Sequence, residues 1–326
     1  MPHRDAAAWP WVRARLLNRL RKQESPAPEA GAVVRVAVVT DSAAALPADW
    51  IAGLSGDGRL TVIPMPVMVG DEIYGEGDDD ISEAIALALA SGTSVKTSRP
   101  SPGQFEQAYL AAQRRGYEAV VSVHISGGLS GTADAARLAA GRVGMPVEVV
   151  DSGTVGMALG MAVQEAVRVA GEGADSGAVA AAAAGQAART TVYFYVPSLE
   201  QLRRGGRIGT AASLWGTMLA IKPILGVDGG KIVPLEKVRS AVRAVARLEE
   251  LVAADASARS AAGVRLAVHH FGNPAEAERL AERLAAALPQ CPPAQISSLP
   301  AVLAAHAGLG VLAVIVGSDL AADHAG

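Results

Sequence analysis

Cysteine is almost absent from this 326-residue sequence, which contains only Cys291. A single thiol forms neither an intrachain disulfide nor a cysteine-rich zinc site, so we expect a protein of the reducing cytoplasm. Aromatic residues are also scarce, at 4%, and the formal net charge is −3. Without a stacking platform or a basic surface, the chain is not expected to bind nucleic acid.

The sequence also lacks an uninterrupted apolar run long enough to span a membrane. The candidate stretch, residues 292–318, has no Asp, Glu, Lys or Arg, but it is interrupted by Pro300, His306, Gly308 and Gly310. A membrane-spanning helix needs about 20 continuous apolar residues. We therefore predict a short helix, a glycine turn and a buried strand here, in a soluble protein.

The N-terminal 22 residues carry five arginines and one lysine against a single acid, Asp5. These charges exclude the apolar core of a signal peptide. Two interpretations stay open for residues 1–31. They form either an amphipathic helix in peripheral contact with an anionic membrane or a flexible basic extension, which we favour.

The length predicts two domains, since one domain usually has about 150 residues. Short, continuous apolar runs indicate strands that are covered on both faces. These strands are expected at 33–40, 120–125, 147–150, 192–196, 266–270 and 311–316. Helical segments alternate with several of them, which predicts an α/β fold with a largely parallel sheet. We assign residues 32–170 to an N-terminal α/β domain and residues 171–320 to a C-terminal α/β domain.

Hydroxyl and carboxylate side chains follow three of the expected strands. They are Asp41 and Ser42 after the first, Ser126, Ser130 and Thr132 after the second, and Asp151 and Ser152 after the third. Ligands of parallel sheets bind at the carboxyl ends of strands, whereas Ser, Thr and Asp are also the usual helix caps. Helix capping alone would explain the polar residues of any one of these loops. Three together favour a polar pocket.

Motifs for nucleotide and serine-hydrolase chemistry are absent. The glycine-rich loop 126–132 has no Gly-Lys-Ser/Thr of a P-loop, and Thr132 stands where a nucleophile elbow needs glycine. His269 and His270 are adjacent on an expected strand, so they point to opposite faces and do not chelate one ion together. We expect no metal and no cofactor. For His306, a hydrogen-bonded core histidine and a carboxylate ligand stay equally open.

Several segments in order resemble the DegV family of fatty-acid-binding proteins. They are Thr40–Ser42, Thr97–Pro102, His124–Thr132, Asp151–Ser152, Leu199–Gly209, Lys222–Leu225 and His306–Gly308. The resemblance covers about residues 33–318. It implies a two-domain fold, an N-terminal, mostly parallel sheet flanked by helices plus a second α/β domain, with a lipid tunnel between the domains.

The resemblance also implies a function. Family members bind one long-chain fatty acid and present its carboxylate to the separate ATP-binding subunit of a fatty acid kinase, which makes the acyl phosphate. The carrier itself is not an enzyme and has no catalytic residue. Ser98 is similar to the family's carboxylate-binding hydroxyl, with Thr97, Ser126 and His306 in the same polar site. Arg207 is similar to the exposed arginine that contacts the kinase.

Two positions depart from the family pattern. Pro66 stands where many members have a threonine near the carboxylate, and Leu309 replaces a proline after His306. Methionine side chains suit a pliable acyl chain, but packing in the core is the favoured role for Met65, Met68, Met157, Met161 and Met218.

Burying about 14 methylenes at roughly 0.8 kcal/mol each supplies about 11 kcal/mol, which exceeds the several kcal/mol needed to desolvate a carboxylate. Two other classes stay open. One is a kinase or hydrolase of small polar substrates that acts alone through Asp41, Asp151 and His306. The other is a lipid-responsive regulatory protein that contacts a partner through its basic N-terminal segment.

Overall fold

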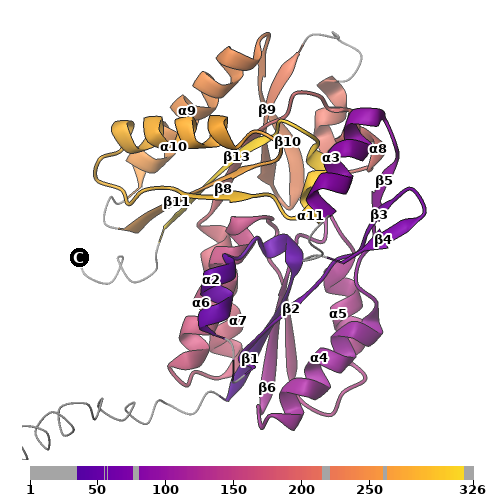
Figure 1. The fold of residues 1–326 in the computed structure, drawn as a ribbon. Coiled ribbons are helices and arrows are strands. Elements are labelled where there is room, and N and C mark those ends of the chain that lie inside the picture. Colours follow the sequence, from indigo (N-terminus) through magenta and orange to yellow (C-terminus); the bar gives the residue numbers. More distant parts are fainter. Residues whose placement is uncertain are drawn as a thin grey trace, which may run out of the picture. The chain divides into compact units, whose positions relative to one another are not determined.

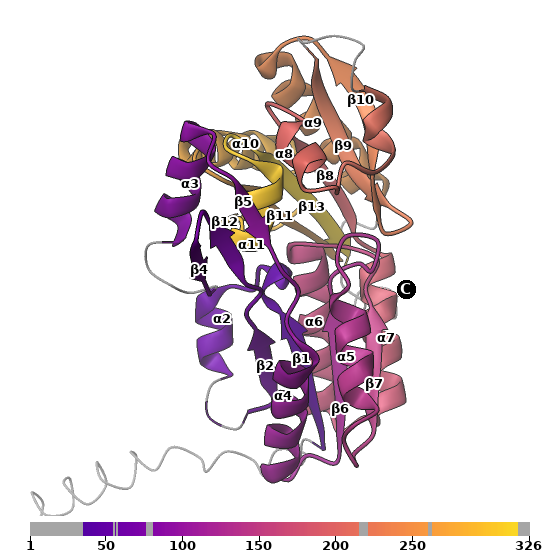
Figure 2. The ribbon, with the colours of Figure 1, turned by 90° about the vertical axis from the view of Figure 1, so that its right-hand side faces the viewer.

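The computed structural model describes residues 35–318, apart from 55, 57, 76–80, 215–220 and 260–262. Residues 1–31 and Met218, about which the sequence made predictions, lie outside the described residues. The described chain folds into three β-sheets and the helices that cover them (Figures 1 and 2). Within this part of the chain, no helix has the length and apolar character needed to cross a membrane.

The first sheet is entirely parallel, with the strand order β2-β1-β6-β7. Its strands are β1 (Val36–Asp41), β2 (Leu60–Ile63), β6 (Ala119–His124) and β7 (Val147–Asp151). Every residue of β1 and β6 is buried, as expected for central strands covered on both faces. The sequence predictions of β1, β6 and β7 and of their parallel arrangement are confirmed, whereas β2 was not predicted.

Helices cover both faces of this sheet (Figure 2). They are α4 (Pro102–Arg114) and α5 (Thr132–Ala140) on one face, and α6 (Met157–Gly171) and α7 (Ser176–Ala188) on the other. The N-terminus of α4 is stabilised by its own sequence, because Ser101 and Gln104 form a reciprocal capping box around Pro102. Short connecting elements are η1 (Ser42–Ala44) and α2 (Ala48–Gly53).

The second sheet is mixed and mostly antiparallel, with the order β10-β9-β8-β13-β11-β12. Its strands are β8 (Thr191–Tyr195), β9 (Lys222–Asp228), β10 (Lys231–Val238), β11 (Val264–His270), β12 (Gln295–Ser298) and β13 (Leu312–Ser318). Only β11 and β12 pair in parallel. One face packs on α9 (Ala241–Ala258) and α10 (Pro274–Ala287).

The prediction of parallel strands is therefore wrong for β8 and β13, and β11 is parallel to β12 but antiparallel to β13. The opposite face of this sheet packs against α6 and the rest of the largest core cluster. Its strands are thus covered on both sides, as in a parallel sheet, although their neighbours run antiparallel. A continuous apolar run reports coverage of two faces and carries no information about strand direction.

A small three-stranded antiparallel sheet and four further helices complete the described fold. The sheet contains β3 (Val67–Val69), β4 (Glu72–Tyr74) and β5 (Val95–Thr97), beside α3 (Ile81–Ser91). The other elements are α8 (Glu200–Arg204), η2 (Gly209–Leu214) and α11 (Ala301–Ala307). The helix, glycine turn and strand predicted for residues 292–318 are confirmed as α11, Gly308–Gly310 and β13.

The division of the chain at residue 170 remains a proposal. Helix α7, which follows that point, packs on α6 and on β6 and β7 of the first sheet. Helix α11, which comes near the end of the chain, packs on α3 and β5. Along the chain, β3, β4 and β5 come between β2 and β6 of the first sheet, and all strands of the second sheet follow α7.

Candidate functional site

A cavity lies between the first and second sheets, with a volume of about 800 Å³ that includes its opening to solvent. Apolar side chains from both halves of the fold make up most of its wall: Ile125, Val155, Val192, Phe194, Val302, Ala313 and Ile315. Such a wall suits a hydrocarbon ligand.

Five polar side chains interrupt this apolar lining: His269, and the four residues Thr97, Ser130, Arg207 and His306. The Thr97 hydroxyl lies 2.7 Å from His306 Nε2. Arg207 donates from Nε to the carbonyl of Leu129, the neighbour of Ser130, at 3.0 Å. We call these four residues the polar cluster.

His306 is held in the polar cluster by its backbone and by a glycine. It stands in the last turn of α11, which ends at Gly308 with a φ of 84°. Its ring rests directly on Gly205, where an added methyl group would lie 2.2 Å from Nδ1. Glycine at position 205 therefore leaves the space that the imidazole occupies.

Burial lowers the pKa of His306 from 6.5 to about 4, with a smaller contribution from the positive charge of Arg207. At neutral pH the ring is therefore uncharged, with one donor and one acceptor nitrogen. An anionic ligand beside it would oppose this shift, because a negative charge favours the imidazolium.

Stability is expected to depend on pH through His306 and His269, a second cavity residue whose pKa burial also lowers to about 4. Between pH 6.5 and 4 the unfolded chain binds more protons than the folded chain, so the free energy of unfolding falls as the pH falls through this range. Above pH 6.5 neither group contributes a slope. Thermal melts of the wild type and of His306→Gln should show a shallower decline in the variant; identical slopes would contradict this assignment.

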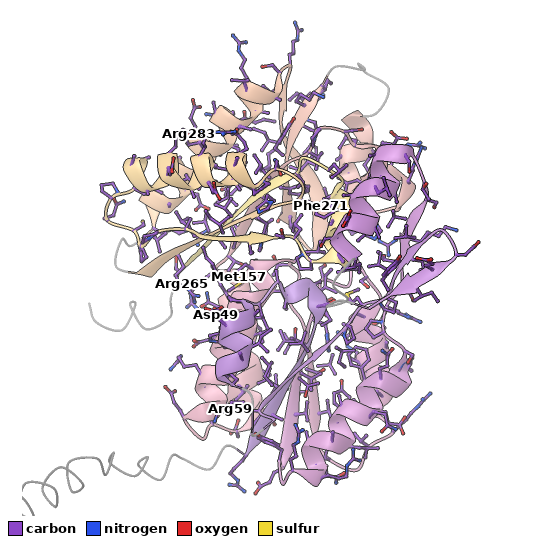
Figure 3. The ribbon with its side chains drawn as sticks, in the orientation of Figure 1. Asp49, Arg59, Met157, Arg265, Phe271 and Arg283 are labelled. Carbon is purple, nitrogen blue, oxygen red and sulfur yellow. The ribbon has the colours of Figure 1, made fainter. Side chains whose placement is uncertain are left out.

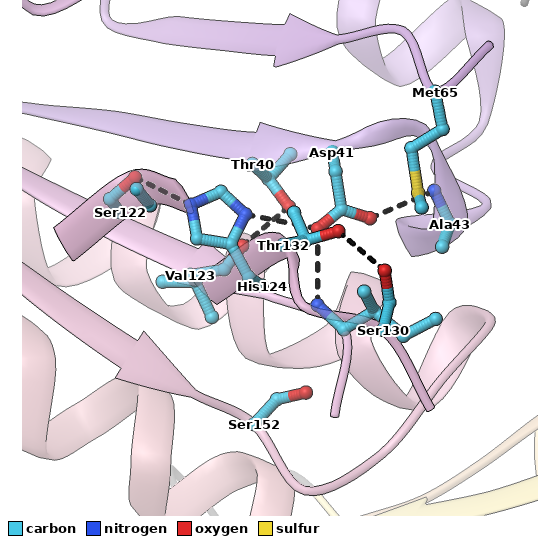
Figure 4. Close-up of polar contacts among 12 residues, drawn as sticks. Thr40, Asp41, Ala43, Met65, Ser122, Val123, His124, Ser130, Thr132 and Ser152 are labelled. Carbon is cyan, nitrogen blue, oxygen red and sulfur yellow. Dashed lines mark hydrogen bonds and ion pairs between the residues drawn. The ribbon is translucent and has the colours of Figure 1, made fainter. Parts of the chain in front are cut away.

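Asp41 belongs to a buried hydrogen-bond network at the end of β1 (Figure 4). Its carboxylate accepts from the backbone N–H groups of Ala43 and Ile125 and contacts His124 Nδ1 at 2.9 Å. His124 Nε2 lies 2.6 Å from the Ser122 hydroxyl, which accepts from Tyr109.

The order Ser122, His124, Asp41 resembles a hydrolase triad, but its surroundings do not. The three side chains are fully buried, and Ser122 is not among the cavity-lining residues. A substrate carbonyl has no route to this hydroxyl. The network therefore supports the core of the first sheet, and it gives no support to a hydrolase that acts through Asp41.

The other strand-end residues bond to groups of their own loops or of a neighbouring segment. Asp151 accepts from the N–H groups of Gly127 and Gly153, and Ser152 accepts from that of Thr154. Ser42 accepts from Met65 N, and Thr132 pairs with Ser130 at 2.8 Å. Of the seven strand-end residues that the sequence placed in a polar pocket, Ser130 alone lines the cavity. Figure 4 shows Ser130, Thr132 and Ser152 near the Asp41 network.

The structure separates the four residues assigned to the carboxylate. Thr97 and His306 meet in the polar cluster. Ser98 is exposed, and its hydroxyl donates to the carbonyl of Arg99 at 3.1 Å. Ser126 is buried and donates to the carbonyl of Gly230 at 2.7 Å, which ties its loop to the turn between β9 and β10. Neither serine lines the cavity.

The structure also places Arg207, three of the methionines and Pro66, which the sequence analysis singled out. Arg207 is partly buried at the cavity, where the sequence led us to expect an exposed side chain. Met65 lines the cavity, whereas Met157 and Met161 belong to the surrounding core. The carbonyl of Pro66 accepts from Ser98 N at 3.0 Å and so fixes the end of β5 next to Thr97.

Comparison with known proteins identifies the family. A sequence model of the DegV family matches residues 35–319. A DegV domain-containing protein of Streptomyces coelicolor is 44% identical over 283 residues, which are 87% of this chain and 98% of that protein. The chain belongs to the DegV family. The DegV resemblance drawn from the sequence motifs is thereby confirmed.

Solved DegV structures share the fold. A DegV family protein from Thermus thermophilus, described for its fatty acid binding, superposes with a TM-score of 0.80 at 31% identity, covering 87% of this chain and 100% of that one. DegV of Bacillus subtilis, described as a fatty acid binding protein, gives a TM-score of 0.77 at 29% identity over 87% and 99% of the two chains. The predicted α/β fold, with a parallel sheet and a second mixed sheet, is confirmed.

Proposed function

We propose that this DegV protein binds one long-chain fatty acid in the cavity between its two larger sheets. The observation that carries the proposal is the apolar cavity with a polar cluster in its wall. Each buried methylene contributes about 0.8 kcal/mol, so the hydrocarbon chain supplies the affinity. The fatty acid binding described for the Thermus and Bacillus proteins supports this assignment.

The polar cluster would hold the carboxylate. Thr97 and His306 supply a hydroxyl and an imidazole that already contact each other, and Arg207 adds a positive charge nearby. Hydrogen bonds to a charged group are stronger than neutral ones and offset its desolvation. Ser98 and Ser126 stand next to this cluster in the chain or in space, but their hydroxyls have protein partners.

Denaturing extraction followed by mass spectrometry tests the proposal directly. The purified protein should release a long-chain fatty acid in an amount close to one per chain. A polar ligand, or turnover of a small substrate by the purified chain alone, would contradict it and favour the enzyme interpretation.

We further propose that the bound acid is presented to a separate ATP-dependent fatty acid kinase, which forms the acyl phosphate. Arg207 would then pair with the phosphoryl group or with an acidic surface of the kinase. Its present bonds to the carbonyls of Leu129 and Gly205 would have to break for this contact. Unchanged kinase-dependent phosphorylation in Arg207→Ala would contradict this role.

The geometry predicts that Thr97→Val impairs the headgroup site more than Ser98→Ala. Thr97→Val keeps the shape of the side chain but removes the hydroxyl that meets His306, whereas Ser98 points away from the cavity. Both variants, and His306→Ala, should retain bound lipid, because the hydrocarbon chain dominates affinity. Kinase-dependent acyl-phosphate formation should fall about tenfold in Thr97→Val, which corresponds to the loss of one hydrogen bond to a charged group.

Two results of this assay would contradict the proposed headgroup site. A larger loss in Ser98→Ala than in Thr97→Val would restore the assignment drawn from the motif and would place the carboxylate outside the polar cluster. Complete loss of lipid from His306→Ala would show that the headgroup, and not the chain, supplies the affinity.

A further inference from the structure

Helix α6 begins without a cap from its own sequence. The first N–H groups of a helix have no partner inside the helix, and Ser, Thr, Asp or Asn usually supply one. The residue in the cap position is Gly156, which has a φ of 66° and no side chain. Helix α6 is nevertheless central to the fold, because it packs on β1, β6 and β13 and so lies between the two larger sheets.

The missing acceptor comes from the second sheet. His269, near the end of β11, lies 112 residues away in sequence, and its Nε2 accepts from Met157 N at 3.1 Å. Figure 3 shows Met157 at the end of α6 that meets this sheet. Glycine at position 156 is favoured by its φ of 66° and not by lack of space, since an added methyl group there would lie 3.4 Å from Nε2, in ordinary van der Waals contact.

The contacts of His269 settle which nitrogen carries the proton. A backbone N–H only donates, so Nε2 must be unprotonated and Nδ1 must hold the hydrogen. Nδ1 lies 2.9 Å from the Ser297 hydroxyl on β12, which can accept it. The ring is almost completely buried, at 1% exposure, and burial lowers its pKa to about 4, so the neutral form persists at neutral pH.

His269 is also part of the cavity wall. It lines the cavity together with Val155 and Gly156, which precede α6, and with Ala313, its partner in the neighbouring strand. A single side chain thus bonds to the helix on one side of the cavity and belongs to the sheet on the other side.

We propose that His269 is a positioning residue that caps α6 across the cavity and holds the two walls at the separation an enclosed acyl chain requires. This inference rests on the proposed binding of a fatty acid. Separation of the two walls widens the way out for a chain held between them, and it breaks the bond from Met157 N to His269. Loss of this bond should therefore speed release of the ligand.

The test compares three variants with the wild type. His269→Ala removes the acceptor, and His269→Gln replaces Nε2 by a carbonyl oxygen that can accept the same bond. His270→Gln is the matched control, because this neighbour points to the opposite face, toward α10, and its Nδ1 has no hydrogen-bond partner among the described residues. The probe is deuterated stearate loaded into each protein, and its transfer to phosphatidylcholine vesicles is followed by mass spectrometry.

We expect stearate to leave His269→Ala about tenfold faster than the wild type, the factor that corresponds to one lost buried hydrogen bond. The Met157 amide should exchange with solvent faster by a similar factor. His269→Gln should recover most of both losses, and His270→Gln should match the wild type. In the wild type, ¹⁵N chemical shifts of the imidazole should show the proton on Nδ1 at pH 7.

Several results would overturn the inference. Wild-type release and amide exchange in folded His269→Ala would do so, as would equal acceleration in His270→Gln, which would indicate general loss of stability. If His269→Ala does not fold, Ser297→Ala replaces it. This variant frees the ring without removing it, and release at the wild-type rate would then count against the inference. A wild-type protein that takes up no stearate would refute the proposed function itself.

Discussion

Replacing Ala313 with phenylalanine should abolish retention of a fatty acid while the protein remains folded. Ala313 lies on β13, is 6% exposed and lines the cavity. Its neighbours in the adjacent strands are Phe194 and His269, which also line the cavity. The added phenyl ring therefore has no place to go except into the space that we assign to the hydrocarbon chain.

The expected size of this effect follows from the apolar surface that the ligand can no longer bury. If the phenyl ring keeps only two methylenes of the ligand out of the cavity, the free energy of binding weakens by about 1.6 kcal/mol. This loss corresponds to a more than tenfold lower affinity. Overpacking is expected to lower the free energy of unfolding by about 1–3 kcal/mol. The measurement is the amount of fatty acid extracted per mole of folded protein, and the smaller change Ala313→Val should give an intermediate value.

The matched control for this experiment is Ala246→Phe. Ala246 is an exposed residue of α9 that lines a separate hollow beside α10. The same side chain is added there without entering the cavity between the sheets, so lipid content should not change. Wild-type lipid content in Ala313→Phe would show that the ligand lies elsewhere, and this result would end the proposed function.

The second large effect is expected on stability. Asp41→Ala should lower the free energy of unfolding by about 3–5 kcal/mol, because it leaves His124 and two backbone N–H groups without an acceptor in the core. Asp151→Ala is the natural comparison. Asp151 also ends a strand of the first sheet and also accepts from two backbone N–H groups, but it is exposed, and water can replace it.

Urea unfolding of the two variants measures the difference. Asp151→Ala should cost about 1 kcal/mol, the usual net contribution of a hydrogen bond that water can replace. Equal losses in the two variants would contradict the structural role of the network around Asp41. A variant with the stability of the wild type but without bound lipid would instead place Asp41 in the binding site.

Local sequence was sufficient for much of the fold. Continuous apolar runs placed the central strands of the first sheet, and the glycines at 308 and 310 marked the turn between α11 and β13. The alternation of side chains along a strand was enough to predict that His269 and His270 point to opposite faces of the sheet. These predictions succeed because they depend on neighbours in the chain.

Other features depended on partners that are distant in sequence. Asp41 and Asp151 look alike as strand ends, yet only Asp41 is covered by α4 and β6 residues such as Tyr109 and His124. Thr97 and Ser98 are adjacent hydroxyls, and only the packing of α11 on β5 decides that Thr97 meets His306. No local pattern could show that His269 caps a helix 112 residues away.

The sequence by itself determined where strands and helices form and, through its ordered motifs, the family to which the chain belongs. It did so because hydrophobic periodicity, caps and glycine turns act over a few residues. The tertiary structure alone decided the direction of the strands in the second sheet, the residues that line the cavity and the burial of each polar group. Burial and hydrogen-bond satisfaction are properties of a three-dimensional neighbourhood, and each neighbourhood here combines segments from opposite ends of the chain.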